Sequence, residues 1–300
     1  MLVGDKFVYN LYDLTAGNRS LGGEVGMGKE SLESMLLSPR IYSDCDFPLL
    51  FHYTSLEATC KIIESNNLKL GSLSRTNDPL EFCKFYDHEL IGNLSGKEII
   101  KIRQEEEQAK AASRILCFCH DIIFHSDDKN KEYPLTIKET DQTICSNYLY
   151  KGWGKVRMWA QYADNHRGAC MVFDKDELLA EFEKLKNDGI TTHHERINYS
   201  NDFSKLDNRR FKGNEINYLF QKCEDFRDEN EYRFCTIDTK QEVSFDFGNS
   251  LKAIILGERL SYLIKINSSY CNSIKQLKIK WRCGLPILLD EQGNSIFNFF

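Results

Sequence analysis

Two short blocks, far apart in the chain, combine ionisable side chains with the alternating pattern of β-strands. The first reads Phe-His-Tyr-Thr-Ser over residues 51–55, and the second reads Glu-Asn-Glu-Tyr-Arg-Phe over residues 229–234. Side chains alternate between the two faces of a strand, so the second block places Glu229, Glu231 and Arg233 on one face and two aromatic rings on the other. A fold that contains these blocks therefore needs strands with one core face and one charged face.

The first block predicts a strand that ends where a helix begins. Residues 48–53 form a short apolar run, and Thr54 followed by Glu57 matches a capping box. His52 then lies at the end of a strand and has two interpretations. It is a structural histidine, or it is a neutral imidazole that presents a ring N–H to a ligand.

The charged face of the second block also has two interpretations. One is an exposed edge on which Arg233 pairs with its neighbours and contributes little to stability. The other is a functional carboxylate that stabilises positive charge or binds a ribose hydroxyl. Glu231 is the better candidate for that role, because core residues on either side fix its place on the strand.

The order of predicted elements favours an α+β fold. Strands and helices alternate early, whereas strands cluster late at residues 231–237, 242–247, 253–256 and 276–281, the first two as a plausible hairpin. This order predicts a mixed, largely antiparallel sheet with flanking helices. We expect an N-terminal extension over residues 1–47, with a short helix near its end, and a single α+β domain over 48–300.

Composition narrows the class of protein. The 300 residues are 41% hydrophobic and 28% charged, as in ordinary globular proteins, and the net charge of −6 argues against uniform electrostatic binding of nucleic acid. The 11 cysteines lie mostly in apolar runs and are odd in number, which indicates free thiols. Neither a secretory signal nor an apolar run of membrane-spanning length is present. We expect a cytoplasmic protein that makes no membrane contact.

Further polar groups accompany aromatic residues in the middle of the chain. Trp159 and Tyr162 are neighbours on a predicted helix, and His166 follows in a turn. Core packing explains the two aromatic residues as well as ligand contact does. Asn77 and Asp78 form either a helix cap or part of a ligand site. Arg75, close to the same turn, is a candidate to contact a phosphate group.

Two motifs resemble sites of known chemistry but depart from them. Residues 23–29 match the glycine and lysine spacing of a phosphate loop, yet Glu30 stands where Ser or Thr should bind magnesium. Cys117, Cys119 and His120 suggest zinc, yet alternate strand residues are expected to face the core and paired ligand clusters are missing. We expect no metal.

Five ordered blocks resemble a bacterial domain-of-unknown-function family, number 2971 in that series, over residues 48–260. They are Phe51–Ser55, Ser74–Glu81, Leu116–Cys119, Met158–Gly168 and Glu229–Arg233. The pattern is similar to the ADP-ribosyltransferase superfamily. That resemblance implies a split-sheet fold with NAD as substrate, and it implies no metal.

By this resemblance, His52 orients the ribose of NAD and Glu231 stabilises an oxocarbenium-like transition state. Glu229 helps to choose the acceptor, and His166 is an alternative for that role. The aromatic residue beside nicotinamide is Tyr53, Tyr162 or Trp159, with Arg75, Asn77 and Asp78 as further contacts.

The resemblance implies an ADP-ribosyltransferase or an NAD-cleaving enzyme that serves as a bacterial defence or toxin effector. The acceptor is a protein or a nucleic acid. The alternative is an effector module, for example in phage defence, that binds or senses nucleic acid without NAD chemistry. In that case Arg75, Arg157, Arg167 and Arg233 line a phosphate-binding groove. A third interpretation is a purely structural charged strand face that points to solvent.

Overall fold

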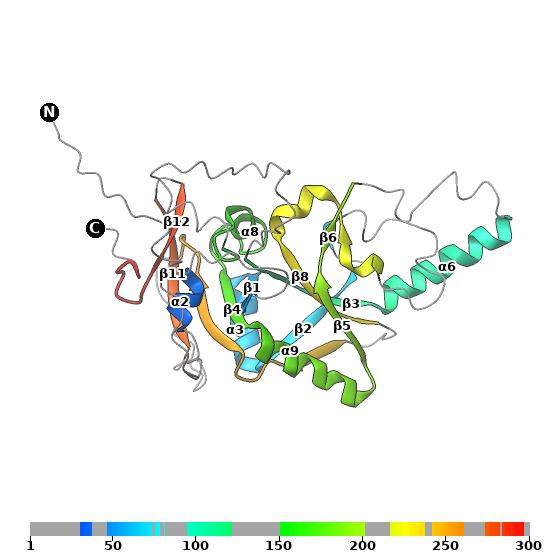
Figure 1. The fold of residues 1–300 in the computed structure, drawn as a ribbon, viewed down its shortest axis with the longest axis horizontal. Coiled ribbons are helices and arrows are strands. Elements are labelled where there is room, and N and C mark those ends of the chain that lie inside the picture. The colour runs from blue at the N-terminus through cyan, green and yellow to red at the C-terminus, as the bar shows by residue number, and fades with distance from the viewer. Residues whose placement is uncertain are drawn as a thin grey trace, which may run out of the picture.

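The fold is built on one large sheet with helices on both faces (Figure 1). The computed structural model describes residues 31–37, 47–73, 76–78, 81, 95–121, 151–201, 217–237, 242–260, 274–282 and 284–296. Within these residues the main sheet has ten strands. Its strand pairings are antiparallel except for the parallel pairing of β10 (Leu251–Leu256) with β11 (Lys275–Arg282). The predicted mixed, largely antiparallel α+β architecture is therefore confirmed.

Eight strands follow one another across this sheet. In spatial order they are β12 (Leu285–Leu289), β11 (Lys275–Arg282), β10 (Leu251–Leu256), β4 (Ala169–Asp174), β1 (Leu49–Thr54), β3 (Arg114–Cys119), β2 (Asn67–Ser72) and β9 (Val243–Asp246). The other two strands, β8 (Glu231–Ile237) and β5 (Thr191–Arg196), extend the sheet from β3. A separate parallel pair consists of β6 (Asn198–Tyr199) and β7 (Gln221–Lys222).

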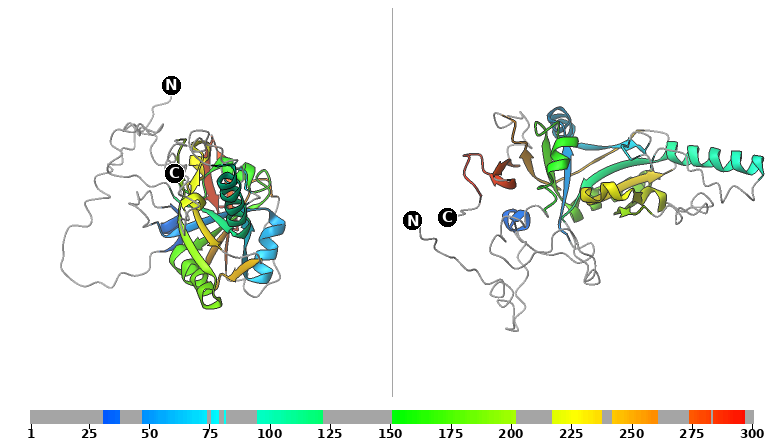
Figure 2. Two further views of the ribbon diagram at one scale, coloured as in Figure 1. Left: turned by 90° about the vertical axis from the view of Figure 1, so that its right-hand side faces the viewer. Right: turned by 90° about the horizontal axis from the view of Figure 1, so that it is seen from above.

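Helices cover the sheet and connect its strands. The α-helices are α2 (Leu32–Leu37), α3 (Leu56–Ser65), α6 (Gly96–Ala112), α8 (Val156–Gln161) and α9 (Lys175–Glu183). The 3₁₀ helices are η4 (Lys184–Asp188), η7 (Asn217–Phe220) and η8 (Glu224–Glu229). Helix α6 extends away from the sheet at the end opposite to β12, as two views show (Figures 1 and 2). No described helix has the length and apolar character that crossing a bilayer requires.

The sheet forks at β3. This strand pairs along its whole length with β8 on one edge, so its remaining edge must serve both β1 and β2. Cys119, at the end of β3, pairs with Phe51 of β1, whereas Ile115, near the start, pairs with Gly71 of β2. Strands β1 and β2 therefore diverge along β3, and a gap opens in the hydrogen-bond ladder between them.

The centre of the sheet is buried on both faces, which is why β1 and β4 read as continuous apolar runs. Leu50 of β1 packs in a cluster that includes residues of α3 and α9, while Leu49, Phe51 and Tyr53 pack in a second cluster with α2 and α8. Helix α2, within the predicted N-terminal extension, thus contributes to the core through the fully buried Leu36.

Two local predictions were wrong. The helix α3 begins after Ser55, whose hydroxyl accepts from Ala58 N at 3.2 Å, whereas Thr54 is the last residue of β1. Strands β8 and β9 do not form a hairpin, because β9 pairs with β2 and β8 pairs with β3 and β5. The partners of β8 and β9 are set by contacts between strands that are far apart in the chain, and a local sequence pattern carries no information about such contacts.

Gly168, directly before β4, offers a test of this packing. A Cβ atom on Gly168 would lie 2.2 Å from Thr54 O and 2.9 Å from Ala163 backbone atoms, so Gly168→Ala forces β1 and β4 apart. We expect the free energy of unfolding to fall by at least about 1–3 kcal/mol, as for other overpacked sites. Chemical denaturation measures this. The control is Gly96→Ala at the exposed start of α6, where a Cβ meets nothing within 4 Å. Equal stability of Gly168→Ala and wild-type protein would contradict the close approach.

Candidate functional site

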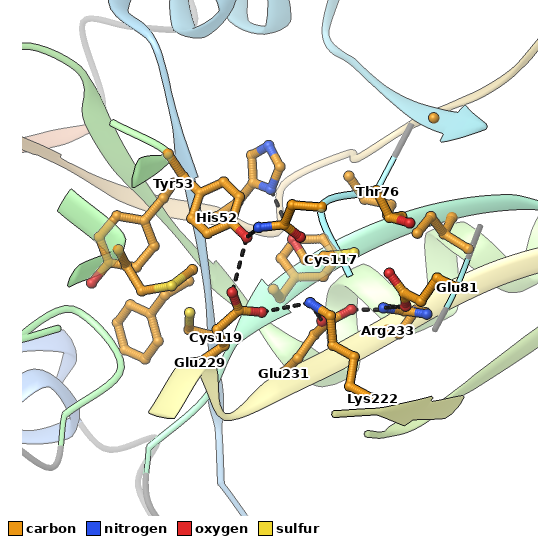
Figure 3. A pocket seen from close by; sticks show the side chains of 18 of the residues that line it. His52, Tyr53, Thr76, Glu81, Cys117, Cys119, Lys222, Glu229, Glu231 and Arg233 are labelled. Atoms are coloured by element: carbon orange, nitrogen blue, oxygen red, sulfur yellow. Dashed lines mark hydrogen bonds and ion pairs between the residues drawn. The ribbon is translucent and has the colours of Figure 1, made fainter. Parts of the chain in front are cut away.

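A cavity of about 300 Å³ lies at the fork of the sheet (Figure 3). Its walls come from β1, β2 and β3, from α8 and the turn after it, from the segment around Asn77, and from the stretch that runs from β7 through η8 into β8. The lining residues are Phe51, His52, Tyr53, Lys69, Gly71, Thr76, Asn77, Glu81, Ile115, Leu116, Cys117, Phe118, Cys119, Met158, Tyr162, Lys222, Glu229, Glu231 and Arg233. Both of the separated sequence blocks therefore contribute to one cavity.

The charged side chains of the second block are buried. Glu231 is 3% exposed and Arg233 is 0% exposed, so the interpretation of an exposed strand edge is wrong. Arg233 Nε donates to Glu231 Oε1 at 2.6 Å, and Arg233 Nη1 donates to Leu219 O at 2.7 Å. The charges face the inside of the molecule because β8 lies between β3 and β5.

Glu229 reaches the same cavity by a different route from the one expected. It ends the 3₁₀ helix η8, and Asn230 then adopts a left-handed backbone conformation with φ 43°, so the strand begins only at Glu231. Glu229 therefore does not share a strand face with Glu231 and Arg233. The turn nevertheless directs its side chain into the cavity wall, where it is 3% exposed.

Lys222 joins the two glutamates. Its Nζ donates to Glu229 Oε2 at 2.6 Å and to Glu231 Oε2 at 2.9 Å. Burial opposes ionisation of Glu231, but the charges of Arg233 and Lys222 outweigh it and lower the pKa of Glu231 to about 2. Sequence reasoning missed Lys222, because it is an isolated lysine in the two-residue strand β7 and its pairing with β6 has no sequence signature.

A second chain of hydrogen bonds runs from Glu229 toward Asn77. The Tyr162 hydroxyl donates to Glu229 Oε1 at 2.9 Å, and Asn77 Nδ2 donates to the Tyr162 hydroxyl at 2.5 Å. Arg157, which is partly exposed, lies 3.3 Å from Glu229 Oε1 and also pairs with Asp228 at 2.8 Å. One side of the cavity thus carries a continuous polar network in which the charges alternate in sign.

The far end of this network is Glu81. Arg233 Nη2 lies 2.5 Å from Glu81 Oε1, and Glu81 is 3% exposed. Burial raises the pKa of Glu81 more than the neighbouring Arg233 lowers it. Sequence analysis placed Glu81 in a family-like block but gave it no role.

His52 fills the gap of the fork. Its Nδ1 lies 3.0 Å from the Cys117 carbonyl oxygen, midway between the residues of β3 that pair with β1 and with β2. A carbonyl only accepts, so Nδ1 carries the proton; burial lowers the pKa of His52 and favours the neutral ring. The prediction that a ring N–H faces a ligand is therefore wrong, because the neutral ring leaves Nε2 as an acceptor.

The other predicted contacts divide between the cavity and the core. Tyr53 lines the cavity, but its hydroxyl donates away to Gly152 O at 2.7 Å. Trp159 is fully buried in the core behind Tyr53 and does not line the cavity. Asp78 is also buried, and its carboxylate accepts from Cys223 N at 2.9 Å, so it ties two segments together.

His166 does not reach the cavity either. Its ring stacks on Trp159 with centroids 6.4 Å apart and lies beside Trp281. The prediction for Arg75 lies outside the described residues, as do those for the phosphate-loop-like residues 23–29. Arg233 is buried and paired, so it cannot line the phosphate-binding groove of the nucleic-acid alternative.

The thiols of Cys117 and Cys119, which were expected to face the core, line the cavity. Cys117 and Cys119 project from β3, and burial raises the pKa of both thiols. Neutral thiols are weak nucleophiles and weak metal ligands. Among the described residues, no three His, Cys, Asp or Glu side chains gather as a metal site.

One comparison with known proteins gives a match. A family model described as "Protein of unknown function (DUF2971)" matches residues 158–234, which include the end of α8, all of β7 and most of the charged network. No curated protein matches the chain. No solved structure matches it. The match supports the domain-of-unknown-function family that the sequence blocks resemble and assigns no activity.

Replacing Lys222 tests the buried network. In Lys222→Met, Glu229 and Glu231 face each other without their shared cation, so we expect unfolding to become easier by about 3–5 kcal/mol at pH 7. Because the pKa of Glu231 is lowered, its contribution is present above its ordinary pKa of 4.5 and is lost as the pH falls toward 2. The deficit should therefore shrink as the pH falls from about 4.5 to about 2, measured by denaturant titration.

Lys61→Met is the matched control for this experiment. Lys61 pairs with Glu57 on the surface, where both side chains are largely exposed, so no measurable change is expected. A Lys222→Met protein as stable as Lys61→Met would show that Lys222 does not hold the two carboxylates together.

Proposed function

We propose that the chain binds NAD in the cavity and breaks the bond between nicotinamide and ribose, as an ADP-ribosyltransferase or NAD glycohydrolase. One observation carries the proposal: His52 and the pair Glu229 and Glu231 line the same cavity, although they are far apart in sequence. The sequence resemblance assigns the same residues to NAD chemistry, and the forked, largely antiparallel sheet is consistent with the split sheet that it implies.

The size and lining of the cavity suit part of NAD. Its volume of about 300 Å³ is at the lower end of the roughly 300–1,000 Å³ of typical ligand pockets. A ring and a sugar fit this volume, and the rest of the dinucleotide would extend outside. Apolar side chains of Phe51 and Met158, which pack in the second core cluster, offer contact to the ring, while the polar network offers acceptors for ribose hydroxyls.

Glu229 is our first choice for the carboxylate that meets the substrate. Both oxygens of Glu231 are bound by fully or almost fully buried cations, which offset its negative charge. By contrast, Oε1 of Glu229 is bound by the Tyr162 hydroxyl and approached by the partly exposed Arg157, which a substrate hydroxyl can replace. Glu231 and Lys222 would then hold Glu229 in place.

The proposed reaction breaks one bond and makes one. The electron pair of the glycosidic bond leaves with the nicotinamide nitrogen, so neutral nicotinamide departs and positive charge develops at the anomeric carbon. Glu229 stabilises that charge together with Glu231, and His52 Nε2 accepts from a ribose hydroxyl. A nucleophile from the acceptor, which is a protein, a nucleic acid or water, forms the new bond to the same carbon and releases its proton to solvent.

Substitution of the two glutamates tests the proposal. We expect Glu229→Gln to lower the rate of nicotinamide release by roughly 10²–10³-fold, as for the loss of other pre-organised electrostatic groups. We expect Glu231→Gln to lower the rate too, with a larger loss of thermal stability because Arg233 and Lys222 lose a partner. Chromatography of nicotinamide released from NAD measures the rate, and thermal melting measures stability.

Glu57→Gln, on the exposed face of α3, is the control and should match wild type in both measurements. The proposal fails if the wild-type chain does not cleave NAD in the presence of candidate protein and nucleic-acid acceptors. It also fails if both glutamate variants cleave NAD at the wild-type rate.

A further inference from the structure

Glu81 is a buried carboxylate that lines the cavity, and its ion-pair partner among the described residues is Arg233. In the described part of the chain, neither of its oxygens accepts a hydrogen bond. Arg233 Nη2 lies 2.5 Å from Oε1, but this contact is between charges and does not have the alignment of a hydrogen bond. Buried polar groups in folded proteins are almost always hydrogen-bonded, so Glu81 calls for a missing partner.

The other carboxylates of the cavity do not share this property. Glu229 accepts from Tyr162 and Lys222, and Glu231 accepts from Arg233 and Lys222, so each oxygen of both groups has a donor. Glu81 instead ends the network. An ionised carboxylate has about four lone-pair positions, and those of Glu81 that face the cavity are open to a donor that occupies it.

The surroundings define the chemistry of that donor. Thr76 lines the cavity near Glu81 (Figure 3). The Thr76 hydroxyl already donates to Leu73 O at 3.0 Å. An anionic group would meet the Glu81 carboxylate at short range in a buried site, where like charges repel strongly. A group that carries N–H donors satisfies Glu81 and adds no like charge.

We infer that Glu81 accepts hydrogen bonds from an N–H donor group of the bound ligand, so that the Glu81 end of the cavity is a subsite for a carboxamide or a guanidinium. The inference rests on the proposed function where the donor is the nicotinamide carboxamide. A guanidinium from an acceptor arginine is the second source of the same chemistry. In either case Glu81 determines specificity, because it accepts an amide and rejects the corresponding acid.

Three small probes test the subsite by calorimetric titration: nicotinamide, nicotinic acid and methylguanidinium. We expect the wild-type chain to bind nicotinamide or methylguanidinium and to exclude nicotinic acid. Glu81→Gln should weaken binding of the N–H donor probe by roughly 10- to 100-fold, the range for loss of a hydrogen bond to a charged group. It should also reduce the discrimination against nicotinic acid. Glu57→Gln, on the surface, should leave all three affinities unchanged.

Glu81→Asp serves as a second variant because it keeps a negative charge near Arg233 while withdrawing the carboxylate by one methylene. Thermal melting checks that both variants fold. If neither folds, the wild-type affinities decide, because equal binding of nicotinamide and nicotinic acid overturns the inference.

The remaining outcomes separate this inference from the proposed function. Nicotinamide bound equally by wild type and Glu81→Gln overturns the subsite and leaves NAD cleavage intact. Methylguanidinium bound in a Glu81-dependent way, without NAD cleavage, supports the subsite and overturns the proposed function. Absence of binding by every probe at millimolar concentration overturns the subsite.

Discussion

Three strands compete for the two edges of β3, and the site exists because of this competition. Strand β8 occupies one edge completely, so β1 and β2 share the other and must diverge. A strand that loses its neighbour leaves backbone groups unpaired, which is unfavourable in a buried sheet. Here the His52 ring binds the Cys117 carbonyl in the gap. This hydrogen bond satisfies a backbone carbonyl of β3 and also holds the imidazole at the wall of the cavity.

The buried charges follow from the same arrangement. With β8 held between β3 and β5, Glu231 and Arg233 have no access to solvent and must be neutralised inside the protein. Lys222 and Glu81 arrive from separate segments and complete an alternating chain of charges. Removing one member leaves an uncompensated buried charge, so the network constrains how these segments pack as well as what the cavity binds. A ligand meets side chains that are already fixed in position.

The strands of the central sheet could be predicted from sequence, because both of their faces are apolar. The short apolar run over residues 48–53 predicts a strand and forms β1, and the helix expected after it forms α3. The gathering of His52, Tyr53, Asn77, Tyr162, Glu229 and Glu231 at one cavity agrees with the site residues that the resemblance implied. Their roles remain predictions.

What sequence could not provide was the partner of each charge. Lys222 and Glu81 have no local motif that marks them, since their importance comes from contacts between segments far apart in the chain. Trp159 and His166 were predicted near the ligand, yet Trp159 faces the core from within α8, and the turn after α8 places His166 beside Trp159 and Trp281. Spacing along a helix indicates which side chains are neighbours but not what lies opposite them.

The central claim is that the fork of the sheet is a ligand site in which His52 and Glu229 contact the same sugar. A crystal structure of the chain with a non-cleavable NAD analogue tests it most directly. The account predicts the nicotinamide ring and its ribose inside the cavity, with ribose hydroxyls within hydrogen-bond distance of His52 Nε2 and the Glu229 carboxylate. An analogue bound elsewhere on the chain, with the cavity closed by the same side chains as here, would contradict it.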